Sequence, residues 1–117
     1  MFRLATIAVL VGLAGPALAE GAGTYAVQGA NPGGEGAYKG TATLAQTGKG
    51  TWSMTWRVAN DTYSGYGVGD GKVLAIAYTG GGGSGVVSYV ANPDGSYSGI
   101  WTTAQGRSAG LETLTPR

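Results

Sequence analysis

From residue 24 onward, short runs of alternating apolar and polar side chains are separated by clusters of Gly, Pro, Asn and Asp. The clearest run covers residues 51–59, in which every second side chain is apolar: Trp52, Met54, Trp56 and Val58. A period of two is typical of a strand with one buried face. The same pattern predicts eight strands, at residues 24–28, 38–46, 51–59, 62–68, 73–78, 86–91, 96–103 and 111–115. No segment combines helical apolar spacing with capping residues.

The connections between these runs have the length of hairpin turns, so neighbouring strands are expected to be antiparallel. We predict a type I′ turn at Asp70-Gly71 and a glycine-rich loop over residues 80–85. Closing such a meander removes its exposed edges. Glycine inside strands suits the bends of a small barrel, and the chain has 24 glycines. The fold class predicted is all-β, a single small antiparallel up-and-down β-barrel of about eight strands; a β-sandwich is the alternative.

The first residues have the features of an export signal. Arg3 is followed by an uncharged apolar stretch over residues 4–15, and Ala17-Leu18-Ala19 has the small-x-small form of a cleavage site. The stretch is too short for a membrane-spanning helix, which needs about 20 apolar residues. We therefore predict a signal peptide at residues 1–19, a single β-barrel domain at residues 20–117, and an exported protein, periplasmic or extracellular.

Charge and composition exclude several classes of function. Without Arg3 the chain has six basic and six acidic residues, so nothing favours binding to nucleic acid or to an anionic membrane. The chain has no histidine and no cysteine. The usual general bases, nucleophile–base pairs and transition-metal ligands are therefore missing. We predict no catalytic residues, no metal site and no cofactor.

Carboxylates are the one catalytic option that the composition leaves. A glycosidase-like pair could be drawn from Glu35, Asp61, Asp70, Asp94 and Glu112. All but Glu112 fall in predicted turns, where carboxylates are ordinarily solvated. For Glu112, a surface ion pair with Arg57 is the simplest expectation. A hydrolase using Glu35 and Glu112 is kept only as a third hypothesis, and the protein is predicted not to be an enzyme.

Aromatic side chains are the most informative feature. The alternation assigns four tyrosines to the interior: Tyr38, Tyr66, Tyr78 and Tyr97. Recurrent Tyr-x-Gly triplets suggest that a ring covers the glycine two positions further along. Such rings fill the core of a small barrel, and some can instead line a pocket at its mouth. The candidate ligand-binding residues are Trp52, Trp56, Tyr38, Tyr97 and Trp101.

Several motifs together resemble a known group of proteins. The motif Gly23-x-Tyr25-x-Val27-x-Gly29-x-Asn31-Pro32 is accompanied by Tyr38-x-Gly40, Trp52-x-Met54-x-Trp56, Tyr63-x-Gly65-x-Gly67, Gly99-Ile100-Trp101 and Gly110-Leu111-Glu112-x-Leu114-Thr115-Pro116. Over most of the chain after the signal, this pattern resembles small exported bacterial proteins often labelled fibronectin-binding protein. The hairpins also look like those of avidin-type barrels. The first resemblance implies an adhesin-like role, and it implies no particular site residues.

Two binding functions therefore stay open. The first is an exported, non-enzymatic binding module, adhesin-like, whose partner is an extracellular matrix protein such as fibronectin. The alternative is a small-molecule carrier that holds an apolar or ring-bearing ligand in the barrel lumen. Stable membrane insertion is not expected, because a membrane barrel needs strands of about 9–11 residues with apolar belts. The sequence assigns no oligomeric state.

Overall fold

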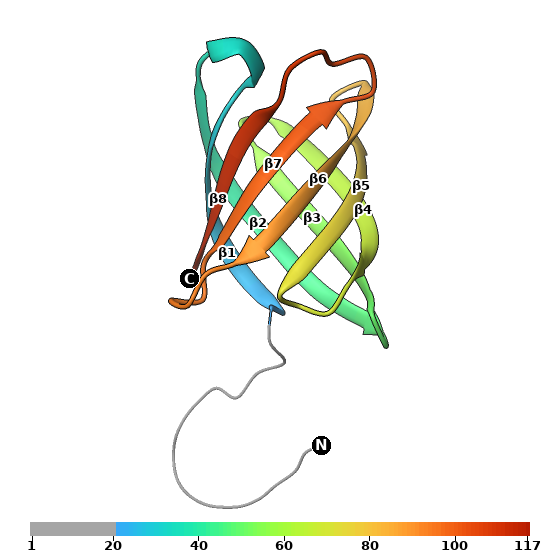
Figure 1. Ribbon diagram of the computed structural model, residues 1–117. Coiled ribbons are helices and arrows are strands. Elements are labelled where there is room, and N and C mark those ends of the chain that lie inside the picture. Colours follow the sequence, from blue (N-terminus) through green and yellow to red (C-terminus); the bar gives the residue numbers. More distant parts are fainter. Residues whose placement is uncertain (1–20) are drawn as a thin grey trace, which may run out of the picture.

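The computed structural model describes residues 21–117, and the predicted signal peptide at residues 1–19 lies outside this range. The strands are β1 (Gly23–Ala30), β2 (Ala37–Gly48), β3 (Thr51–Val58), β4 (Asp61–Gly69), β5 (Val73–Gly80), β6 (Gly83–Ala91), β7 (Tyr97–Thr103) and β8 (Gly110–Pro116). Each strand pairs antiparallel with the next, and β8 pairs with β1 to close the barrel (Figure 1). The predicted up-and-down barrel is confirmed, and the sandwich alternative is wrong.

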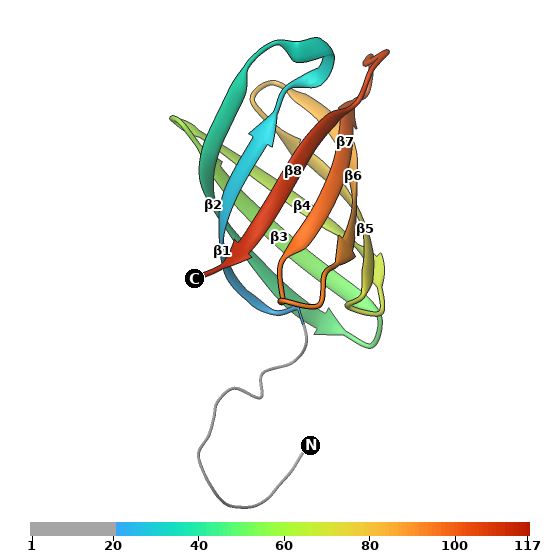
Figure 2. The same cartoon turned by 60° about the vertical axis from the view of Figure 1, so that its left-hand side comes forward.

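The two ends of the barrel differ in their connections. One end carries the short 3-10 helix η2 (Pro32–Gly34) between β1 and β2, together with the β3–β4, β5–β6 and β7–β8 connections. We call it the η2 end. The other end, called the terminal end, carries the remaining turns, the start of β1 and the C-terminus (Figures 1 and 2). None of the helical segments within residues 21–117 is long and apolar enough to cross a membrane.

The terminal end is closed by aromatic side chains. Trp52 donates its indole N–H to the carbonyl of Gly69 at 2.9 Å, and the Tyr97 hydroxyl donates to the carbonyl of Gly71. These contacts satisfy the polar atoms of large rings that are otherwise buried. The same buried core includes Val27, Leu44, Met54, Leu74, Ile76 and Leu114.

Interior rings pack against glycines that face them across the sheet. Tyr89 pairs with Gly99 of β7, and a Cβ at Gly99 would lie 2.6 Å from Cδ1 of Tyr89. Tyr38 pairs with Gly29 of β1 in the same way, with only 2.1 Å between a Cβ and Cζ of the ring. The same pairing joins Tyr63 to Gly80, Tyr78 to Gly85 and Trp101 to Gly110. The glycine that each ring covers therefore lies on the neighbouring strand. The sequence had suggested a glycine two positions further along the same strand.

Two turn predictions need correction. The type I′ turn lies at Gly81-Gly82, where φ is +58° and +82°, and it joins the paired Gly80 and Gly83. At Asp70 the side chain instead accepts hydrogen bonds from the backbone of Lys72 and Val73 at 2.8 and 3.0 Å. The glycine-rich run is therefore a tight turn, because β6 begins at Gly83 and not after residue 85.

Tyr66 is the one tyrosine that the alternation placed on the wrong face. It points outward from β4 with 75% of its surface exposed, whereas Tyr63 points inward. The glycines that alternate with Tyr66 carry no side chain, so the hydrophobic pattern of this strand does not show which face is buried. Other exposed apolar side chains on the outer face of β4 to β8 are Val68, Val73, Val86, Val90, Ile100 and Leu111.

The ring-over-glycine packing predicts a steric effect that can be measured. Gly99→Ala places a methyl group against the ring of Tyr89, and we expect it to lower the free energy of unfolding by about 1–3 kcal/mol. Gly83→Ala is the matched control, because no atom lies within 4 Å of its Cβ position. Urea unfolding followed by circular dichroism measures both variants. Equal stability of the two would contradict the packing described.

Candidate functional site

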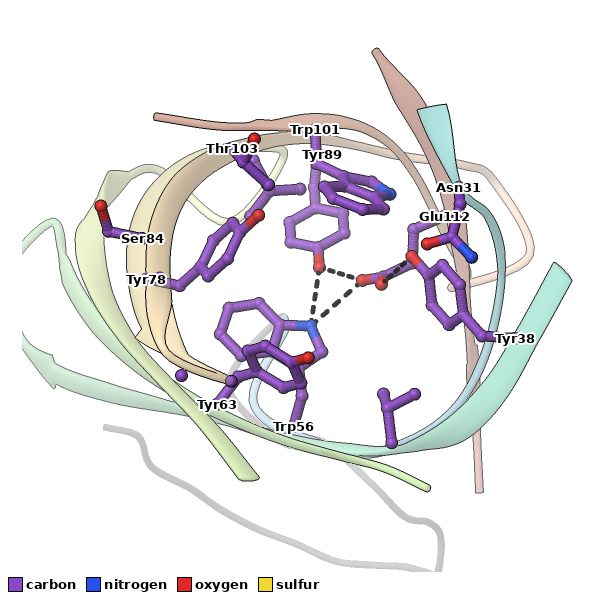
Figure 3. A pocket seen from close by; sticks show the side chains of 15 residues that line it. Asn31, Tyr38, Trp56, Tyr63, Tyr78, Ser84, Tyr89, Trp101, Thr103 and Glu112 are labelled. Carbon is purple, nitrogen blue, oxygen red and sulfur yellow. Dashed lines mark hydrogen bonds between the residues drawn. The ribbon is translucent and has the colours of Figure 1, made fainter. Parts of the chain in front are cut away.

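At the η2 end the barrel interior is hollow. A cavity of about 340 Å³ lies among side chains from β2 to β8 (Figure 3). Six aromatic residues line it: Tyr38, Trp56, Tyr63, Tyr78, Tyr89 and Trp101. Smaller residues complete the lining, among them Asn31, Val58, Ser84, Val87 and Thr103, with glycines of the β5–β6 hairpin. The barrel therefore has a packed half and an aromatic, hollow half.

Glu112 is a buried carboxyl group in the wall of this cavity. It comes from β8 and only 7% of its surface is exposed. The Tyr38 hydroxyl donates to its Oε1 at 2.7 Å. The Trp56 indole N–H lies between two acceptors, Oε2 of Glu112 and the Tyr89 hydroxyl oxygen, with Nε1 3.1 Å from each. The Tyr89 hydroxyl in turn donates to Oε2 at shorter range (Figure 3). Three donors from three strands meet at one group, which suits an ionised carboxylate because it can only accept.

The surroundings of Glu112 are polar but electrically neutral. Its hydrogen-bond partners are phenols and an indole, and no Lys or Arg is among the described residues that line the cavity. Burial, and then the charge of Glu112, raise the pKa of Tyr89 well above its ordinary value. The same two causes raise the pKa of Tyr38, with the nearby Trp101 indole N–H acting in the opposite direction. Both phenols therefore stay protonated and remain donors to the carboxylate.

The rings contact one another by their edges. Trp56 and Tyr78 have ring centroids 5.7 Å apart, Tyr63 and Tyr78 6.2 Å, and Tyr38 and Trp101 6.1 Å, all at steep interplanar angles. This edge-to-face arrangement is favourable for aromatic pairs. The Tyr78 hydroxyl is further fixed by donating to the carbonyl of Thr102 at 3.2 Å. The wall is therefore held in place by its own contacts.

The structure separates the sequence-predicted ligand residues into two groups. Tyr38, Trp56 and Trp101 line the cavity, whereas Trp52 and Tyr97 belong to the packed terminal end. The indole N–H of Trp101 is buried and has no hydrogen-bond partner among the described residues. Sequence reasoning omitted Tyr63, Tyr78, Tyr89 and Glu112 from the candidate site.

The prediction that Glu112 forms a surface ion pair with Arg57 is wrong. Arg57 is exposed on the outer face of β3, because it alternates with the inward Trp56, and it makes no ion pair with Glu112. Glu112 itself points inward, since it shares a strand face with the buried Leu114. Glu35 is exposed and does not line the cavity. Within the described range, no three Asp or Glu side chains come together that could hold a metal ion.

Fold and site together define the chain as a closed eight-stranded up-and-down barrel with an aromatic, carboxylate-containing cavity at one end. The sequence matches no protein-family model, and it matches no curated protein.

The hydrogen bonds to Glu112 predict a difference between two tyrosine variants. Tyr89→Phe removes one donor from a buried carboxylate, so we expect unfolding to become easier by about 1.5–3 kcal/mol. Tyr66→Phe makes the same chemical change on the outer face and should shift stability by less than about 0.5 kcal/mol. Chemical denaturation compares them. The network would be refuted by a Tyr89→Phe protein as stable as wild type.

The raised phenol pKa values predict how stability changes in alkali. Because the folded state holds the protons of Tyr89 and Tyr38 more tightly than the unfolded chain, their stabilising contribution is complete below about pH 10. It is lost as the pH rises above this value. Urea midpoints measured across this range should fall, and phenolate absorbance should show tyrosines that ionise only as the protein unfolds. Full ionisation of every tyrosine in the folded protein near pH 10 would contradict the buried network.

Proposed function

We propose that this protein binds a small ring-bearing molecule in the cavity at the η2 end and does not transform it chemically. The observation that carries this proposal is the cavity itself, about 340 Å³ of space in a barrel whose other end is packed. Eight-stranded barrels are just wide enough either to be filled by side chains or to hold one small ligand. The size lies at the lower end of the range for ligand pockets, so the ligand is expected to be small.

The composition of the wall supports the same proposal. Ligand pockets combine an apolar, aromatic lining with a few polar groups that fix the orientation of the ligand. Here the six rings provide the apolar surface, and Asn31, Ser84, Thr103 and Glu112 provide polar atoms. Backbone pairing around the closed barrel holds these side chains, so the site is formed before any ligand enters.

A binding role without catalysis fits the chemistry of the cavity. Glycoside hydrolysis by carboxylates ordinarily uses a pair of them that flanks the bond to be broken. Glu112 is the only Asp or Glu among the described residues that line the cavity, and its oxygens are engaged by neutral donors. A carrier or binding module is therefore favoured over a hydrolase built on Glu35 and Glu112.

A protein partner on the outer surface is the second candidate function. The exposed apolar side chains on the outer face of β4 to β8, including Val68, Ile100 and Leu111, offer a surface for a matrix protein such as fibronectin. This role, and the export that it requires, depend on the resemblance of the motifs and on the predicted signal peptide. The cavity has no part in it.

A titration with 2-phenylethanol tests binding in the lumen. About nine non-hydrogen atoms at about 0.3 kcal/mol each give a dissociation constant on the order of 10 mM or tighter. Val87 is buried in the cavity wall, so Val87→Phe fills the space and should weaken binding at least about tenfold. Ile100→Phe adds the same ring on the outer face and should leave binding unchanged. Tryptophan fluorescence reports the titration, because Trp56 and Trp101 line the cavity.

Two results would overturn lumenal binding. One is the absence of saturable binding to the wild-type protein, both of 2-phenylethanol and of charged molecules of similar shape. The other is weaker binding in Ile100→Phe with no change in Val87→Phe, which would place the ligand on the outer face and favour the surface-partner function. Thermal unfolding of both variants confirms that each is folded under the conditions of the titration.

A further inference from the structure

The cavity combines a buried carboxylate with a wall of aromatic rings, and this combination has a definite chemical preference. We propose that the ligand is an organic cation, an ammonium group carried on an apolar or aromatic body, with the ammonium beside Glu112 and the body among the rings. This inference rests on the proposed function and adds to it the charge of the ligand.

The balance of charge in the cavity is the first argument. Glu112 is surrounded by neutral donors, and the described residues that line the cavity include no Lys or Arg. A buried charge without an opposite charge nearby is unfavourable, and it is stabilised by any cation that enters. An anionic ligand would instead meet the carboxylate at close range with nothing to compensate it. The site therefore favours a positive ligand and rejects a negative one.

The remaining capacity of the carboxylate is the second argument. A carboxylate offers about four acceptor positions, and three are used by Tyr38, Trp56 and Tyr89. Oε1 accepts only from Tyr38, so it retains a position for one further donor. The existing donors fix the orientation of the group, and an ammonium N–H can occupy the free position. Glu112 is thus held by the protein and still able to bind.

The aromatic wall is the third argument. Cations are attracted to the faces of aromatic rings within about 6 Å, and several rings around one site form an aromatic cage. Figure 3 shows Tyr78 at the left of the space, Tyr89 above it, Trp56 and Tyr63 below it, and Tyr38 with Glu112 at the right. A ligand with an ammonium group on a phenyl body can use both features together: the carboxylate binds its charge, and the rings contact its charge and its body.

Three probes of the same shape test the charge preference on the wild-type protein. They are phenethylammonium, neutral 2-phenylethanol and anionic phenylacetate, each titrated at pH 7, where a primary amine is protonated. We expect phenethylammonium to bind at least about tenfold more tightly than the alcohol. Phenylacetate should bind more weakly than the alcohol. Isothermal titration calorimetry and tryptophan fluorescence give the three dissociation constants.

A pair of glutamate variants assigns the preference to Glu112. Glu112→Gln removes the charge and keeps the shape, so it should weaken phenethylammonium binding at least about tenfold and weaken binding of the alcohol by a clearly smaller factor. Glu35→Gln makes the same change at an exposed position near η2 and should alter neither. Tyr63→Leu, which removes a half-buried ring from the wall, should reduce the preference for the cation by a smaller factor.

The outcomes separate this inference from the function on which it rests. If the alcohol binds and phenethylammonium binds no more tightly, the charge preference is wrong and lumenal binding stands. The same conclusion follows if Glu112→Gln folds and binds phenethylammonium as wild type does. If none of the three probes binds the wild-type protein, the proposed function itself fails. If Glu112→Gln does not fold, the comparison of the three probes on the wild-type protein still shows whether the cavity prefers a cation.

Discussion

The structure of the η2 end depends on one buried carboxylate and the neutral side chains that donate to it. Glu112 of β8 is bound by Tyr38 of β2, Trp56 of β3 and Tyr89 of β6, so four strands are joined across the lumen by hydrogen bonds. The rings that donate cannot collapse onto one another without leaving buried polar atoms unsatisfied, which is unfavourable. The same network therefore holds the space open and sets its charge.

Close packing of rings on glycines makes this arrangement possible in so small a barrel. An eight-stranded barrel has little interior volume, and large side chains on facing strands would overlap. Tyr38 over Gly29 and Tyr89 over Gly99 resolve the conflict by placing a ring where the partner strand has no side chain. Toward the terminal end the interior is filled by Trp52 and Tyr97 instead. One half of the barrel is thereby packed and the other is left hollow.

Strand number, order and closure could be predicted from the sequence, because period-two alternation and turn residues mark each strand of a meander. The site was predicted less well. Tyr38, Trp56 and Trp101 could be selected as rings on inward faces. Alternation shows which face of a strand a side chain occupies, but not how far it lies along the barrel axis. For this reason Trp52 and Tyr97 were grouped with the three rings that line the cavity. Glu112 lies two positions before Leu114 and therefore shares the inward face of β8. This spacing is the sequence signal that could have placed Glu112 in the lumen. Its partners lie on three other strands, at separations that no local pattern encodes.

The central claim, that Glu112 accepts hydrogen bonds inside the barrel, can be tested most directly on the indole N–H protons by nuclear magnetic resonance. The three tryptophans provide an internal comparison, since Trp56 donates to Glu112, Trp52 donates to a backbone carbonyl and Trp101 has no partner among the described residues. In the spectra of wild type and of a variant with Glu112 neutralised, the Trp56 resonance should move most and exchange faster with solvent, while that of Trp52 stays in place. An unchanged Trp56 resonance would show that its indole N–H does not donate to the carboxylate of Glu112. The buried hydrogen-bond network would then be absent from the cavity.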